Sequence, residues 1–83
     1  MRGLSQPSVT TLRALRRGCT LVSEVAAAGD CRPETAYMRL KALRAIGYVE
    51  RDGDTYRLTW AGQDALQRHD AALYRRWAER RAA

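Results

Sequence analysis

Apolar residues recur at helical spacing near the start of the chain, between signals that begin and end a helix. Three of them lie three positions apart: Val9, Leu12 and Leu15. Ser5 stands before them as an N-cap residue, and the proline at the next position but one suits a first helical turn, where no N–H donor is needed. Gly18 follows two arginines at the other end, as is typical of a helix C-terminus. The pattern predicts a helix over 6–17.

The next two helical patterns are separated by a short turn. Thr20 is expected to cap a brief helix over 20–29, which ends at a Gly-Asp pair that tolerates turn conformations. Its predicted inner face consists of Leu21 or Val22, together with Val25 and Ala28. The longer helix over 32–46 places three apolar residues on one face: Ala36, Leu40 and Leu43. Gly47 stops this helix.

Residues 48–58 contain two β-prone runs around a glycine turn, which predicts a hairpin. The register follows from the side chains. If the loop is Gly53-Asp54, Val49 faces Leu58, an apolar pair. The same register places Glu50 opposite Arg57, an anion opposite a cation. A loop shifted by one residue loses both pairs.

Thr59 is positioned to cap a last helix over 60–81. Along this helix, apolar residues repeat at i, i+7 and i+11, with one aromatic residue beside them: Leu66, Leu73, Trp77 and Tyr74. The stripe is longer than a domain of three short helices and a hairpin needs to cover its own core.

The order of these elements resembles the winged helix-turn-helix, and three segments carry the resemblance. Residues 20–29 (TLVSEVAAAG) look like the first helix and turn of such a motif, and residues 36–51 (AYMRLKALRAIGYVER) look like a recognition helix leading into a wing. Residues 58–62 (LTWAG) are similar to the exit from the wing in the MarR and PadR families of bacterial regulators. The resemblance implies a single mainly α domain over 1–83, with a three-helix core, a two-stranded wing at 48–58 and a C-terminal helix.

Length and composition agree with this architecture. Eighty-three residues suffice for one small domain, and 46% hydrophobic with 29% charged residues is typical of a folded protein and not of a disordered one. No apolar run approaches the roughly 18 residues of a membrane span, so we expect a cytoplasmic protein. Two cysteines and one histidine cannot form a four-ligand zinc site, so the thiols are expected to be small buried hydrophobes, without metal or cofactor.

The net charge of +6 favours a polyanionic partner, with nucleic acid ahead of a membrane surface. The distribution of charge along the chain weakens this inference. Residues 1–17 carry four arginines and no acid, residues 18–62 carry six cations and six anions, and residues 63–83 carry five arginines and three acids. The middle of the chain is therefore neutral. A GC-rich coding sequence would also enrich arginine without any binding purpose.

In helix-turn-helix proteins the second helix of the motif enters the major groove and the wing contacts the backbone or the minor groove. The matching candidates for DNA contact are Arg32, Glu34, Thr35, Tyr37, Met38, Arg39 and Lys41 on the helix, and Arg51 and Arg57 on the wing. Candidates for phosphate contact on the first helix are Arg13, Arg16 and Arg17. The alternative is that the helix face is only solvated and that the hairpin has only a structural role, because both would carry the same residue types. Asp52 and Asp54 at the wing tip would also repel phosphates.

The apolar stripe of the last helix has three interpretations. In the resembling families such a helix packs against its twin, which would make Leu66, Leu73, Tyr74 and Trp77 a homodimer interface. It could instead fold back on the core of its own chain, or bind a foreign protein or a membrane surface.

The leading hypothesis is a bacterial or phage transcriptional regulator that binds double-stranded DNA as a homodimer. The alternative is a protein-interaction module on a winged-helix scaffold, which binds or inhibits a partner through the last helix. An enzyme is not expected, because His69, between Arg68 and Asp70, has no nucleophile near it in sequence, and adjacent helical residues diverge.

Overall fold

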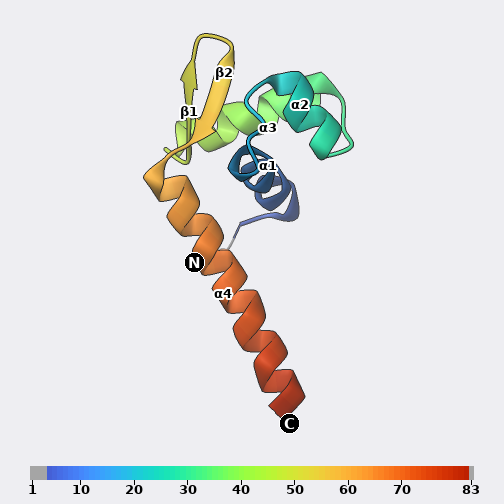
Figure 1. Cartoon of the computed structure of the whole chain (residues 1–83), viewed down its shortest axis with the longest axis vertical. Helices are drawn as coiled ribbons and strands as arrows, with labels where there is room; N and C mark the ends of the chain where they lie inside the picture. The colour runs from blue at the N-terminus through green and yellow to red at the C-terminus, as the bar shows by residue number, and fades with distance from the viewer. Residues whose placement is uncertain (1–3, 83) are drawn as a thin grey trace.

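Three short helices, a β-hairpin and one long helix make up the chain (Figure 1). The computed structural model describes residues 4–82. The elements, in chain order, are α1 (Gln6–Arg16), α2 (Val22–Ala28), α3 (Pro33–Ala45), β1 (Val49–Asp52), β2 (Thr55–Leu58) and α4 (Trp60–Ala82). The predicted fold class, mainly α with a small hairpin, is confirmed. The predicted helix ends need small corrections, since α1 and α3 are shorter than 6–17 and 32–46, and α4 runs one residue past 81.

Helix α1 begins and ends as its sequence indicates. The Ser8 N–H donates to Ser5 Oγ at 3.3 Å, which caps the helix, and Gly18 follows the helix with a φ of +111°. The three apolar residues of the predicted inner face are all buried: Val9, Leu12 and Leu15. Helix α1 crosses beneath α2 and α3 and also packs against α4.

Helix α2 starts later than predicted, and its cap comes from another residue. Glu24 Oε1 accepts the Thr20 N–H at 2.8 Å and the Leu21 N–H at 3.1 Å, so the backbone before the helix is bound by this carboxylate, and the expected cap by the Thr20 hydroxyl is not formed. These backbone bonds hold the pKa of Glu24 below its ordinary value. The inner face is formed by Val22, Val25 and Ala26, and not by the predicted Ala28, which is exposed.

Helix α3 buries the three residues that periodicity predicted. Ala36, Leu40 and Leu43 are at most 3% exposed, and the helix ends before Gly47, whose φ of +86° suits glycine. The turn between α2 and α3 contains Asp30 at a φ of +51°, a left-handed conformation that aspartate tolerates better than most residues.

The hairpin has the predicted register, with Val49 opposite Leu58 and Glu50 opposite Arg57. Val49 and Tyr56 point into the core, and the Tyr56 N–H donates to the Thr20 carbonyl oxygen at 2.8 Å. The hairpin is therefore attached to the loop before α2 as well as to α3.

Helix α4 is joined to the rest of the molecule at its first turn. The Thr59 N–H donates to the Tyr48 carbonyl oxygen at 3.1 Å, and the Thr59 hydroxyl donates to the Gly47 carbonyl oxygen at 2.6 Å. The same hydroxyl accepts the Gly62 N–H at 3.1 Å, which confirms Thr59 as the cap. Gly62 is buried against the backbone of Tyr48.

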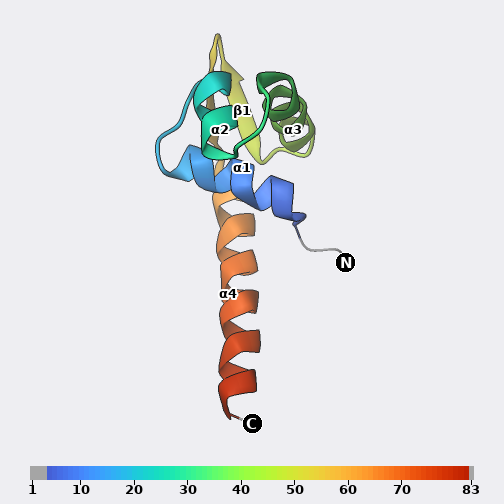
Figure 2. The same cartoon turned by 90° about the vertical axis from the view of Figure 1, so that its right-hand side faces the viewer.

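The outer half of α4, taken as residues 71–82, extends away from the other elements, as two perpendicular views show (Figures 1 and 2). The molecule measures 48 × 24 × 22 Å, and α4 supplies most of its length. Within residues 4–82, no helix combines the length and the apolar character that crossing a bilayer requires.

We predict that Gly62→Ala destabilises the chain by roughly 1–3 kcal/mol, the usual cost of overpacking. A Cβ at this position would overlap the Tyr48 carbonyl oxygen and lie 3.0 Å from its carbonyl carbon, both of which are backbone atoms. In an open helical position the same substitution stabilises by about 0.5–1 kcal/mol. The sign of the change in the free energy of unfolding therefore shows whether Gly62 is crowded. Urea denaturation measures the effect, with Gln67→Ala on the exposed side of α4 as the near-neutral control. A stabilised Gly62→Ala protein would contradict the close approach.

Candidate nucleic-acid interface

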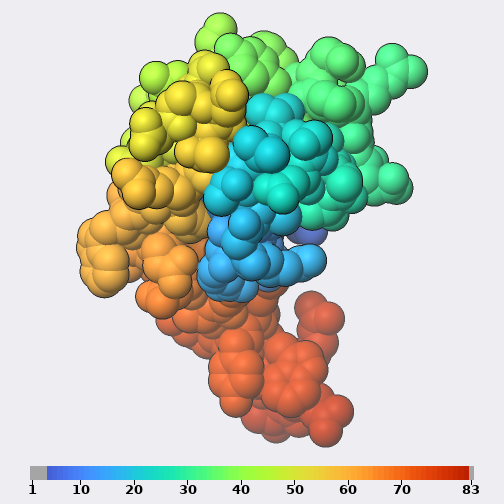
Figure 3. Space-filling view, turned by 45° about the horizontal axis from the view of Figure 1, so that its top comes forward, coloured from blue at the N-terminus to red at the C-terminus, as the bar shows by residue number. Residues whose placement is uncertain are grey.

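The side of α3 that faces away from the core is open to solvent. Tyr37 and Met38 are 40% and 59% exposed, and the polar candidates Glu34, Thr35 and Lys41 are exposed with them. Among the residues that the structure describes, atoms of α3 reach the surface beside α2 and the wing (Figure 3). The surface is thus accessible to a large partner such as a duplex.

Arg39 differs from the other candidates on α3. Its side chain is half-buried, and Nη1 lies 3.6 Å from the Cys31 Sγ, in the turn before the helix. Cys31 and Cys19 are free thiols, half-buried against the core. Arg39 would have to leave the thiol to reach a base.

Both predicted wing arginines bind groups of the wing itself. Arg57 Nε forms an ion pair with Glu50 Oε1 at 2.6 Å. Arg51 Nε donates to the Gly53 carbonyl oxygen at 2.8 Å, and its guanidinium carbon lies 5.6 Å from the centre of the Tyr56 ring. A phosphate would have to compete with these contacts.

Two of the three phosphate candidates on α1 face α4. Arg13 Nη2 lies 2.7 Å from Asp70 Oδ1, and Arg16 Nη1 lies 3.5 Å from Asp70 Oδ2. The hydrogen bond from Arg13 is the main cause that holds the pKa of Asp70 below its ordinary value. Arg17 is exposed at the end of α1.

Some exposed cations make no ion pair within residues 4–82: Arg17, Arg32, Lys41 and Arg44. Arg44 was not among the predicted sites, although it lies one helical turn after Lys41 and its spacing could have revealed it. The structure also has a hollow of about 340 Å³ between α2, α3 and the wing, lined by Leu21, Val22, Ser23, Tyr37, Arg51, Asp54 and Tyr56. Periodicity alone could not identify it, because its walls come from three elements.

The predicted interface on α4 divides into two parts. Leu66 is 0% exposed and belongs to the core of its own chain, so its assignment to an interface with a second chain is wrong. Leu73, Tyr74 and Trp77 lie further along the same helix and are 44%, 69% and 55% exposed. Tyr74 and Trp77 have ring centroids 5.9 Å apart, and the Arg81 guanidinium carbon lies 5.3 Å from the Trp77 ring centre.

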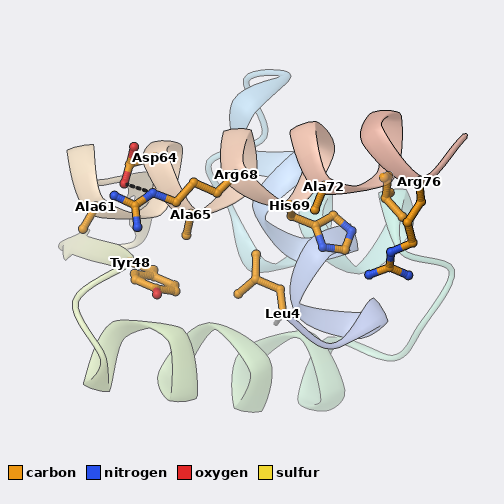
Figure 4. Close-up of a pocket in the computed structure, with 10 residues that line it drawn as sticks. Leu4, Tyr48, Ala61, Asp64, Ala65, Arg68, His69, Ala72 and Arg76 are labelled. Atoms are coloured by element: carbon orange, nitrogen blue, oxygen red, sulfur yellow. Dashed lines mark ion pairs between the residues drawn. The ribbon is translucent and has the colours of Figure 1, made fainter. Parts of the chain in front are cut away.

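A second hollow, of about 440 Å³, runs along α4 and has Leu73 in its lining (Figure 4). Its α4 wall carries small apolar residues with charged residues between them, and Leu4 and Tyr48 form the opposite wall. His69 lines this hollow, while Asp64 and Arg68 form an ion pair with a 3.0 Å separation at its edge.

Comparison with known proteins supports the architecture. No protein-family model matches the chain, and no curated protein matches it. Among solved structures, the MarR family protein Rv2887 of Mycobacterium tuberculosis is 28% identical, with a TM-score of 0.77 over 95% of this chain and 60% of that protein. The chain therefore has a winged helix-turn-helix fold similar to that of MarR-type regulators.

The fold also matches parts of enzymes. The O-methyltransferase NcsB1 from neocarzinostatin biosynthesis is 25% identical, with a TM-score of 0.63 over 71% of this chain and 18% of its own. PigF, solved with SAH, is 29% identical, with a TM-score of 0.58 over 66% of this chain and 16% of its own. This chain thus corresponds to a small part of each of those two proteins, and the fold alone does not define its function.

We predict that Leu66→Ala and Leu73→Ala, which are the same chemical change, lower the free energy of unfolding by different amounts. Leu66→Ala should lower the free energy of unfolding by about 2–5 kcal/mol, because it leaves a cavity in the core. Leu73→Ala should change it by less than about 0.5 kcal/mol, because the side chain is half-exposed. The measurement is urea denaturation at a concentration low enough to keep the chain monomeric. Equal losses would contradict the division of α4 into a packed half and an exposed half.

Proposed function

We propose that this chain is a small transcriptional regulator, which acts in the cytoplasm without catalysing a reaction and binds double-stranded DNA as a homodimer. The observation that carries the proposal is the open face of α3 beside the wing, in a fold similar to that of a MarR family protein. In helix-turn-helix proteins this face enters the major groove.

The residue types on α3 are suited to a few base contacts. Lys41 can donate to guanine, Glu34 can accept from cytosine, and Met38 can contact a thymine methyl group. Around them, the cations without an ion pair in the described chain can neutralise phosphates, which would add about 0.9 per contact to the salt slope of log affinity. The small number of such groups predicts modest affinity for each half-site.

The outer half of α4 supports a dimer. Leu73 and Trp77 continue the helical stripe that Leu66 begins, but unlike Leu66 they are exposed. A two-fold pairing of this segment would cover the exposed aromatic residues and present two α3 helices to two half-sites.

The DNA-binding proposal is tested by fluorescence anisotropy with the duplex upstream of the chain's own coding sequence, across a salt series. We expect log affinity to fall linearly with log salt concentration. Lys41→Ala should weaken binding by about tenfold, the size of one lost charged base contact. Arg68→Ala removes the same charge from α4, where it pairs with Asp64, and serves as the matched control. Absence of binding at low salt, or binding insensitive to salt, would refute the proposal.

The dimer is tested by sedimentation equilibrium. We expect Trp77→Ala to raise the dissociation constant by about tenfold or more, as loss of a central aromatic residue at an interface does. Arg75→Ala, on the opposite side of the helix, should leave the constant within about twofold. A wild-type chain that stays monomeric at high micromolar concentration would remove the homodimer from the proposal.

A second candidate function is a protein-interaction module that binds a partner through the outer half of α4. Two observations favour it: the fold also forms part of O-methyltransferase NcsB1, and acidic Asp52 and Asp54 are exposed at the wing tip. Pull-down from lysate with wild type and Leu73→Asp distinguishes the two functions. A partner lost in Leu73→Asp, together with no DNA binding by the wild type, would favour this candidate.

A further inference from the structure

Asp70 is the outermost residue of α4 that makes a polar contact with another element within residues 4–82. Each of its carboxylate oxygens faces a different arginine of α1, at 2.7 Å for Arg13 and 3.5 Å for Arg16. After Asp70, the polar and aromatic contacts of α4 lie within the helix itself. The orientation of the outer half thus depends on contacts made at or before Asp70.

We propose that Asp70, held between Arg13 and Arg16, positions the outer half of α4 relative to α3 and thereby determines the spacing of the two DNA half-sites that a dimer reads. This proposal rests on the proposed function, because it needs both the dimer and the DNA. Helix α1 provides the link, since it packs against α3 and α4 at once.

The length of α4 makes the position of its end sensitive to such a contact. Leu66 is the last fully buried apolar residue of α4, and at 1.5 Å per residue about 24 Å of helix extends beyond it to Ala82. A rotation of about 10° around Leu66 would move the end of this helix by about 4 Å. Successive base pairs are 3.4 Å apart along DNA, so this movement changes the spacing by about one base pair. Asp70 lies one turn beyond Leu66 and restrains the rotation.

A positioning role explains this contact better than a stabilising role. The Arg13 and Asp70 side chains are 34% and 36% exposed, and exposed ion pairs add little to the free energy of unfolding. Two guanidinium groups on the two oxygens nevertheless restrict the carboxylate in direction as well as in distance. Loss of the charge should therefore widen the range of orientations that α4 adopts, with little change in the stability of the chain.

The first test measures orientation without DNA. Both native cysteines are replaced by serine, and nitroxide labels are attached at Thr35→Cys on α3 and Glu79→Cys on the outer half of α4. Double electron–electron resonance then measures the distance between the two labels. The labelled chain is diluted with unlabelled chain, so that only distances within one chain are recorded. Wild type and Asp70→Glu should give one narrow distribution, and Asp70→Asn and Arg13→Gln should give a broad one. Asp64→Asn removes an equal charge whose partner is on α4 itself, and should stay narrow.

The second test measures spacing preference. Half-sites selected from random DNA by the wild type are placed at separations that differ by single base pairs. The wild type should lose about tenfold in affinity per base pair of misplacement, and Asp70→Asn should lose less than about threefold. Circular dichroism verifies that each variant is folded, and Arg13→Gln repeats the test from the other side of the ion pair.

The outcomes separate the two proposals. A narrow distance distribution in both Asp70→Asn and Arg13→Gln overturns the positioning role, whether or not the chain binds DNA. A broad distribution with an unchanged spacing preference overturns the link to half-site spacing. A wild type that binds no DNA refutes the proposed function, while the distance measurement still decides whether Asp70 orients the helix.

Discussion

The close approach of Gly62 to the backbone of Tyr48 is the contact on which the arrangement of the other elements depends. At this point the beginning of α4 lies directly against the segment that links α3 to the wing, and a side chain on Gly62 would prevent it. Thr59 adds hydrogen bonds to Gly47 and to Tyr48 across the same junction. One small region therefore holds both the wing beside α3 and the first turn of α4.

Four of the fifteen cations form ion pairs with carboxylates of the same chain, within residues 4–82. Arg13 and Arg16 connect α1 to α4, Arg57 connects the two strands, and Arg68 lies over its own helix. A count of cations from the sequence thus overstates the capacity to bind a polyanion. The cations that remain for a partner are concentrated at the end of α1, on α3 and along the outer half of α4.

The sequence was sufficient where a signal is local. The periodicity of α3, the hairpin register and the Thr59 cap each depend on residues close together in the chain, and all three are confirmed. It was insufficient where two distant segments meet. Leu66 and Leu73 occupy the same face of one helix, and the packing of distant elements against only one part of α4 leaves the first buried and the second exposed. The same limit hid the pairing of Asp70 with Arg13, which are 57 positions apart. At the candidate site, periodicity identified the outward face of α3 but could not show that Arg39 contacts the Cys31 thiol.

The buried residues explain why this chain is similar both to a MarR family protein and to parts of methyltransferases. Core residues such as Leu12, Leu40 and Val49 serve the fold, and any winged helix needs a core of this kind whatever it binds. What can differ between functions is confined to surfaces that the core leaves free: the outward face of α3 and the outer half of α4. One junction and one ion-paired carboxylate lie between these two surfaces. Under the proposed role of Asp70, a change that reorients α4 also changes where α3 can be placed on a partner.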